Sequence, residues 1–189
     1  DLPGYPFQRE RHWLDLPNPA RAVTPVPRTA RAPARLQFGV MFFNGTEVPG
    51  DSEKYRLVLA ASRFADEHGF SSVWVPERHY THFGGLYPNP TVLAAALARE
   101  TRSLRLMAGS LVAPLHHPLR IAEDWSLIDN LSGGRVGVSF ASGWNPGDFA
   151  MAPGAYADRH ETVFRTIAEV RRLWRGETVA ATSGTGAAT

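Results

Sequence analysis

The chain has 189 residues, of which 43% are hydrophobic and 11% aromatic, and its net charge is only +2. This composition is that of a globular protein, and so small an excess of basic residues gives no support to nucleic-acid binding. The absence of Cys excludes disulfides, thiolate nucleophiles and Cys-based metal sites. No segment has the apolar length of a membrane span or a signal peptide, so we expect a cytoplasmic protein.

The first part of the chain predicts a linker followed by a strand. Residues 15–35 are rich in Pro, Ala and Arg, and five Pro residues interrupt any helical period, which favours an extended linker. Residues 36–43 (LQFGVMFF) form a short, almost continuously apolar run that stops at Asn44-Gly45. This pattern predicts a buried strand, and a folded unit that begins after the linker.

The remaining sequence alternates between helical and strand patterns. Asp51 or Ser52 can cap a first helix that ends before Gly69, and Asn89-Pro90 opens another. The helix that follows the third strand ends at a Ser-Gly-Gly turn. In chain order, the predicted strands and helices after the first strand cover residues 51–68, 71–76, 89–101, 104–112, 119–131, 135–141 and 157–174.

Four successive βα units predict an α/β fold with a parallel sheet and helical crossovers. An eight-stranded (β/α)8 TIM barrel takes roughly 250 residues, and residues 36–176 supply about half of it, so we expect the N-terminal half of such a barrel. A doubly wound open sheet is the alternative, although its Gly-rich turn is missing after the first strand. Residues 178–189 are small and polar, and we expect a flexible tail there.

Unusual residues follow all four predicted strands. Because parallel α/β folds gather functional groups at the C-terminal ends of their strands, these residues are expected to meet. They combine aromatic side chains, a titratable cluster and small residues that allow close backbone approach, which is typical of a pocket for a flat ligand. The four segments are residues 42–45, 77–80, 109–110 and 142–145.

Three long motifs closely resemble the luciferase-like flavin monooxygenases. They are PERHYTHFGGLYPNP, AGSLVAPLHHPLRIAEDWSLIDNLSGGRVGVSFASGWNPGDF and YADRHETVFRTIAEVRRLWRGE, and the resemblance runs over residues 36–177. It implies an eight-stranded barrel, reduced flavin mononucleotide (FMN), O2 and a homodimer. Because no nicotinamide-binding unit is visible in the sequence, a separate flavin reductase is expected to supply the reduced FMN. The deazaflavin-dependent oxidoreductases share this fold and remain an alternative.

The resemblance also implies roles for the residues that follow the second strand. Bacterial luciferases read Glu-His-His-Phe where this chain has Glu77-Arg78-His79-Tyr80, so the His placed near the flavin is replaced by Arg78. An Arg cannot act as a general base at neutral pH, but it can stabilise an anionic flavin. His79 is the remaining candidate for proton transfer. The alternatives are an ion pair of Arg78 with Glu77 and a purely structural His79.

The third and fourth strand ends carry the other predicted flavin contacts. The family is similar in having a bulge, often with a non-prolyl cis peptide, behind the flavin ring, and the matching bond here is Gly109-Ser110. At the fourth strand end, Ala141 and Ser142 replace a reactive Cys and a phosphate-binding Arg of the luciferases. The predicted cofactor-binding residues are therefore Phe42, Gly109, Ser110, Ser142, Gly143 and Trp144.

Two further groups of side chains are expected to have structural or supporting roles. His116 and His117 are interpreted as residues that start a helix and pack, since no His, Asp or Glu spacing supports a metal site. An apolar lining is expected to exclude water from the flavin, and it consists of Phe42, Phe43, Phe83, Phe140 and Trp144.

Residues 2–15 (LPGYPFQRERHWLD) are similar to the segment that ends an acyltransferase region in modular polyketide synthases. Residues 1–35 are accordingly interpreted as a post-acyltransferase-like segment and linker, next to further synthase domains. The predicted function is hydroxylation, or another oxygenation, of an acyl or aminoacyl intermediate bound to a carrier protein of a polyketide or nonribosomal peptide assembly line. The alternative from a different class is an inactive half-barrel that serves as an interaction or linker module.

Overall fold

The computed structural model describes residues 36–43, 53–81 and 87–187. Strands and helices alternate in it as β1 (Gly39–Met41), α1 (Arg56–Glu67), β2 (Ser72–Val75), α2 (Pro90–Glu100), β3 (Arg105–Val112), α3 (Pro118–Ser132), β4 (Val136–Ala141) and α4 (Arg159–Trp174). The predicted succession of four βα units is thereby confirmed. Short 3-10 helices lie at η1 (Ala113–Leu115), η2 (Pro146–Met151) and η3 (Pro153–Ala155). The predicted linker, the turn at Asn44-Gly45 and the cap at Asp51 or Ser52 lie outside the described residues.

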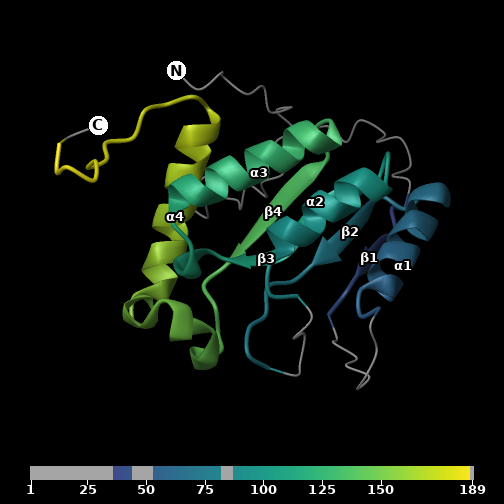
Figure 1. Ribbon diagram of the computed structural model, residues 1–189, viewed down its shortest axis with the longest axis horizontal. Coiled ribbons are helices and arrows are strands. Elements are labelled where there is room, and N and C mark those ends of the chain that lie inside the picture. The colour runs from purple at the N-terminus through teal and green to yellow at the C-terminus, as the bar shows by residue number, and fades with distance from the viewer. Residues whose placement is uncertain (1–35, 44–52, 82–86, 188–189) are drawn as a thin grey trace, which may run out of the picture.

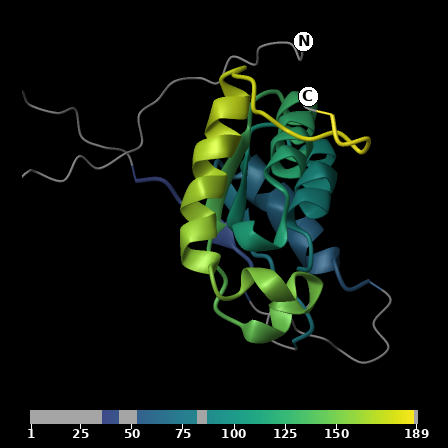
Figure 2. The ribbon, with the colours of Figure 1, turned by 90° about the vertical axis from the view of Figure 1, so that its left-hand side faces the viewer.

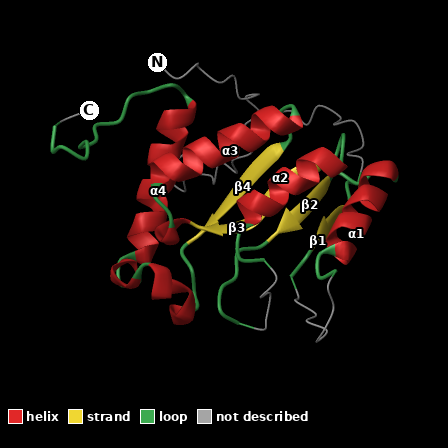
Figure 3. Ribbon diagram, viewed as in Figure 1, coloured by secondary structure: helices red, strands yellow, loops and turns green. Residues whose placement is uncertain are grey.

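The four strands form one parallel sheet in the order β1-β2-β3-β4. Each strand pairs with the next strand of the chain, and neighbouring helices contact one another in the same order (Figure 1). Figure 3 shows the strands side by side, with helices α2 and α3 packed across them. A doubly wound sheet would reverse its strand order at a switch point. The doubly wound alternative is therefore wrong for the residues that the structure describes.

The hydrophobic core lies between the sheet and the helices. Leu97 of α2, Leu106 of β3, Trp125 of α3 and Val170 of α4 are almost completely buried there. Full burial of such a side chain stabilises the fold by roughly 1.5–3 kcal/mol. Trp174, at the end of the apolar stripe predicted for α4, packs against this core. The core therefore fixes the helices against the sheet, and with them the loops at the strand ends.

The opposite face of the sheet is uncovered by the described residues. Met41 of β1 is 53% exposed, and all six residues of β4 are only half-buried. The sequence predicts a buried strand over residues 36–43, and the structure corrects this prediction in extent and in burial. Only Gly39–Met41 form the strand, with an exposed residue at each end, because β1 is an edge strand that pairs with β2 alone.

The helix boundaries follow local capping signals. Asn89 Oδ1 accepts hydrogen bonds from the amides of Thr91 and Val92, both at 3.0 Å, which confirms the predicted start of α2. His117 Nδ1 accepts from the amide of Leu119 at 3.2 Å, so this His starts α3 as expected. Gly133, with a φ of 72°, ends α3 in the left-handed conformation that glycine allows.

Helix α4 begins two residues later than the sequence predicts. The prediction places its start at Ala157, whereas the helix starts at Arg159. The carbonyl of Asp158 accepts from the amide of Thr162 at 2.9 Å and opens the helical hydrogen bonding. The residues before it belong to η2, η3 and a turn, which the sequence analysis did not foresee.

A carboxylate holds the N-terminal end of β3. Asp66 of α1 accepts hydrogen bonds from three successive amides, those of Arg102 (2.7 Å), Ser103 (2.8 Å) and Leu104 (2.7 Å). Burial alone would raise the pKa of Asp66, but these hydrogen bonds outweigh it and lower the pKa from 3.8 to about 2. Asp66 therefore fixes the turn that leads into β3.

A guanidinium group closes the same end of the molecule. Arg135 donates to the carbonyls of Ala98 (3.1 Å), Thr101 (3.0 Å) and Leu104 (2.6 Å), where α2 ends and β3 begins. Burial lowers the pKa of this guanidinium from its ordinary value, and the nearby charge of Asp66 opposes that effect. Arg135 thus replaces the intrahelical donors that the last carbonyls of α2 lack.

Two observations complete the fold. None of the helices in the described ranges has the length and apolar character that crossing a bilayer requires. Residues 178–187 are irregular and close in a turn, in which the amide of Ser183 donates to the carbonyl of Ala187 at 2.8 Å.

Candidate functional site

A cavity of about 340 Å³ lies at the C-terminal ends of β2, β3 and β4. Its volume falls in the range of small-molecule pockets, roughly 300–1,000 Å³. The short helices η2 and η3 lie beyond these strand ends, beside the start of α4 (Figure 2). The predicted site residues that line the cavity are Arg78, Gly109, Ser110, Ser142, Gly143 and Trp144. The structure thus brings residues from three separate strand ends together.

Two predicted site residues do not line this cavity. His79 is buried behind its wall, with 7% of its surface exposed. Phe42 packs against the core, with its ring centroid 6.4 Å from that of Tyr87. Phe140, expected in the apolar lining, also packs against the core, and Phe83 lies outside the described residues.

Arg78 forms an aromatic stack at the cavity. Its guanidinium carbon lies 5.0 Å from the ring centroid of Trp144 and 5.4 Å from that of Phe43. These distances are those of cation–π contacts. The amide of Arg78 also donates to the carbonyl of Tyr87 at 2.9 Å, which fixes the backbone after β2. A permanent positive charge is therefore held at the cavity wall between two flat rings.

The backbone of β3 forms another part of the wall. The Gly109-Ser110 peptide bond is cis, and the pairing of β3 with β4 is irregular between Gly109 and Leu111. Both the bulge and the cis bond are as the sequence resemblance implies. A Cβ at Gly109 would lie 2.9 Å from Cε3 of Trp74, so glycine alone fits this backbone against the tryptophan.

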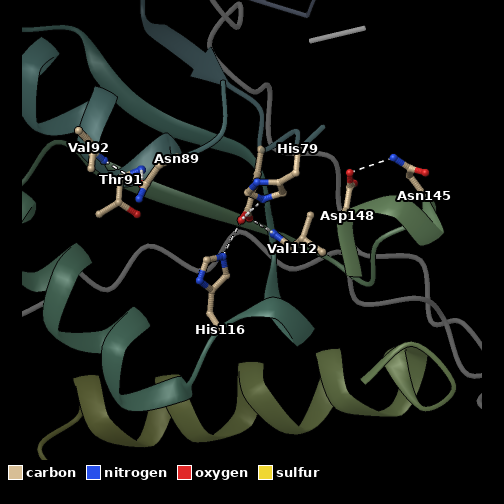
Figure 4. Close-up of polar contacts among 9 residues, drawn as sticks. His79, Asn89, Thr91, Val92, Val112, His116, Asn145 and Asp148 are labelled. Carbon is tan, nitrogen blue, oxygen red and sulfur yellow. Dashed lines mark hydrogen bonds and ion pairs between the residues drawn. The ribbon is translucent and has the colours of Figure 1, made fainter. Parts of the chain in front are cut away.

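The loop after β4 follows a specific glycine conformation. Gly143 has a φ of 80°, and a Cβ there would lie 2.8 Å from the ring of Phe149 and 2.9 Å from Val112. The next turn is held by Asn145, which donates through Nδ2 to Asp148 at 2.9 Å (Figure 4). Asp148 is buried and lines the cavity. The tight loop therefore brings Ser142 and Trp144 to the same cavity.

Arg159 is a candidate ligand-binding residue that the sequence analysis missed. It lines the cavity at the start of α4, together with His160. Its guanidinium carbon lies 4.2 Å from the ring centroid of Tyr156, and its Nη1 donates to the carbonyl of Tyr156 at 2.9 Å. Its Nε atom is buried and has no hydrogen-bond partner among the described residues. A cationic donor in this state suits an anionic ligand.

A buried carboxylate, that of Glu77, belongs to the wall of the cavity. Glu77 Oε1 accepts from His116 Nε2 at 2.6 Å and from His79 Nε2 at 3.0 Å, and Oε2 accepts from the amide of Val112 at 2.6 Å. Figure 4 shows His79, Val112 and His116 approaching one carboxylate from different sides. Burial would raise the pKa of Glu77, but the hydrogen bonds from His116 and His79 outweigh it and keep the pKa below its ordinary value.

Within residues 36–43, 53–81 and 87–187, no group of three or more His, Asp or Glu side chains is placed to hold a metal ion. His116, interpreted from sequence as a packing residue, is instead a partner of the Glu77 carboxylate. The sequence gives no signal for this contact, since 39 positions separate the two residues.

Comparison with known proteins identifies the family. Residues 36–186 match the family described as luciferase-like monooxygenase. The oxygenase component of the flavin-dependent trigonelline monooxygenase of Acinetobacter baylyi is 30% identical over 65% of this chain and 34% of that protein. The alkanal monooxygenase alpha chain of Photorhabdus laumondii is 37% identical over 53% of this chain and 28% of that protein.

Solved structures share the fold. The monooxygenase RslO1 from Streptomyces bottropensis superposes with a TM-score of 0.72 and 30% identity, over 82% of this chain and 47% of that one. The chain therefore spans less than half the length of these relatives. The predicted fold class, a luciferase-like α/β fold with a parallel sheet, is confirmed by this structural neighbour and by the four-stranded sheet, and a partial TIM barrel is consistent with both.

Proposed function

Because the chain belongs to the luciferase-like monooxygenase family, we propose that it forms the N-terminal half of a flavin-dependent monooxygenase that uses reduced FMN and O2. The proposal rests mainly on Arg159, which lines a cavity built from the predicted strand ends. The buried Nε atom of Arg159 has no hydrogen-bond partner among the described residues. A phosphate group would satisfy this donor.

The cavity residues fit the parts of FMN. Arg159, His160 and Ser142 offer a cation, an imidazole and a hydroxyl on one cavity, and we assign them to the phosphate. Luciferases carry a phosphate-binding Arg at the position of Ser142. Arg159 would then supply the positive charge that is missing at this position. The small residues Gly109 and Ser110 and the ring of Trp144 line the same cavity and suit the planar ring system of the flavin.

The protein's own groups have three tasks. Reduced FMN, when bound, supplies the electrons with which O2 is activated for oxygen transfer to a substrate. Arg78 provides a fixed positive charge that stabilises negative charge in the cavity. Phe43 and Trp144 lie against the guanidinium and hold it at the cavity wall. His79 is proposed to move a proton at Nδ1, since its Nε2 is bound to Glu77.

We also propose the substrate class and the partners. The substrate is an acyl or aminoacyl group bound to a carrier protein, and hydroxylation is favoured over Baeyer-Villiger insertion. The support is residues 2–15, which resemble the end of a polyketide-synthase acyltransferase region and lie outside the described residues. Neighbouring synthase domains, a separate flavin reductase and a second copy of the protein are the expected partners.

Cofactor binding tests the proposal directly. FMN is titrated into the complete protein, and its fluorescence gives the dissociation constant. Arg159→Ala is expected to weaken FMN binding roughly 10- to 100-fold, the effect of losing a hydrogen bond from a charged donor. Arg165→Ala is the control, because Arg165 lies exposed on the same helix.

The alternatives give other results. Binding of a deazaflavin without O2 consumption would replace the proposal by a deazaflavin-dependent oxidoreductase. Absence of any flavin binding would favour an inactive interaction module. A monooxygenase should consume O2 only when a flavin reductase is added.

A further inference from the structure

The Glu77 carboxylate is a charged group in an unusual place. It lies at the end of β2, its side chain is fully buried, and three donors bind it. Burying an ion is costly even when it is paired, and an apolar side chain would fill such a position at lower cost. Glu77 also lines the proposed flavin cavity, so the burial of this charge in the cavity wall calls for a role beyond packing.

Glu77 holds the irregular part of β3 at two points. Its backbone amide donates to the carbonyl of Ser110 at 3.1 Å, and its carboxylate accepts from the amide of Val112 at 2.6 Å. These two contacts lie on either side of Leu111, directly after the bulge at Gly109. Gly109, Ser110 and Val112 line the cavity, so the position of this wall depends on Glu77.

The two histidines hold the carboxylate in turn. His116 follows η1, and His79 follows Glu77 by two residues. Both donate through Nε2 to the same oxygen, which leaves the second oxygen for Val112. The orientation of the carboxylate is thereby fixed from two sides. An amide in its place offers only one acceptor oxygen, and it cannot satisfy all three donors.

We propose that Glu77, oriented by His79 and His116, is a positioning residue that sets the β3 wall of the cavity against the flavin. This inference rests on the proposed function, because it assigns the wall to FMN. Glu77 acts through the backbone of Ser110 and Val112, and it also anchors the residue next to it, Arg78. Its loss therefore changes the environment of the bound flavin as well as the stability of the protein.

A matched pair of variants separates positioning from stability. Asp66 holds the N-terminal end of β3 by accepting backbone amides, as Glu77 does at the C-terminal end. Glu77→Gln and Asp66→Asn are therefore compared in the complete protein. The measurements are the melting temperature, the dissociation constant of FMN and the visible circular dichroism of bound FMN.

Both variants should lower the melting temperature. Only Glu77→Gln should change the circular dichroism of bound FMN and raise its dissociation constant, by roughly tenfold, as the loss of one charge-assisted hydrogen bond would. His116→Leu should have the same effects, whereas His116→Gln, whose amide can still donate to the carboxylate, should largely restore the flavin signals.

Three results would contradict the proposals, and each of them contradicts a different statement. FMN binding and circular dichroism that stay at wild-type values in both Glu77→Gln and His116→Leu would overturn the positioning role. Equal changes of the flavin signals in Asp66→Asn would reduce Glu77 to a stabilising residue. A wild-type protein that binds no FMN would instead refute the proposed function.

Discussion

Gly143→Ala should destabilise the protein and weaken flavin binding together. Gly143 has a φ of 80°, a region in which a residue with a Cβ costs about 1–2 kcal/mol. The added Cβ would lie 2.8 Å from the ring of Phe149 and 2.9 Å from Val112. Overpacking of this kind costs about 1–3 kcal/mol more. The free energy of unfolding should therefore fall by about 2–5 kcal/mol.

The effect on the flavin follows from the contacts of Phe149. Its ring packs edge-on against Tyr156 at 5.0 Å, and Arg159 lies over the other ring at 4.2 Å. Displacement of Phe149 should pass to Tyr156 and to the proposed phosphate ligand Arg159. The dissociation constant of FMN should consequently rise in Gly143→Ala.

Gly147→Ala is the matched control in the same loop. A Cβ there would lie 3.4 Å from Asn145 Oδ1, which is an ordinary contact. Urea denaturation and fluorescence titration with FMN should leave this variant close to wild type. If Gly143→Ala matches Gly147→Ala in both measurements, the assigned conformation and packing of the loop are wrong.

Three further variants test other parts of the structure. The pKa of Asp66 is lowered to about 2, so its charge stabilises the fold above pH 3.8 and this contribution disappears as the pH falls through 2. Asp66→Asn should cost about 1–2 kcal/mol at pH 7, and its urea midpoint should converge on that of wild type between pH 4 and pH 2. Arg135→Met leaves buried carbonyls without donors and should cost about 3 kcal/mol in thermal unfolding, with unchanged FMN affinity of the folded protein. His79→Asn should lower the amount of product formed per flavin oxidised and increase hydrogen peroxide release. Unchanged coupling between flavin oxidation and product formation would identify His79 as a packing residue.

Local signals explain why much of the fold is predictable from sequence. Asn89-Pro90 starts a helix through its own side chain and ring, and Gly133 ends one through its own conformation. Such signals depend on neighbours in the chain. The burial of β1 is different, because it depends on what covers an edge strand. An apolar run such as residues 36–43 carries no information on that point.

The site residues also divide into those that the sequence predicts and those that depend on tertiary packing. Gly109, Ser142 and Trp144 could be predicted because parallel strands place their C-terminal ends together. Arg159 could not, because it belongs to a helix whose pattern is explained by its apolar stripe. The only indication was indirect, namely the missing Arg at Ser142. The contact of His116 with Glu77 joins a residue that follows η1 to one that follows β2, 39 positions apart in the chain, and no local pattern encodes it.

Arg135 and Arg159, at opposite ends of the sheet, differ in whether their hydrogen-bond donors serve the fold or are left for a ligand. At the N-terminal end, Asp66 and Arg135 bind backbone amides and carbonyls, so their hydrogen-bonding capacity serves the fold. At the C-terminal end, Arg159 keeps a buried donor without a partner among the described residues, and Arg78 lies against aromatic rings. A buried donor left in this state costs free energy unless a ligand satisfies it. Loss of Arg135 should therefore be measured as instability, whereas loss of Arg159 should be measured as weaker FMN binding with little loss of stability.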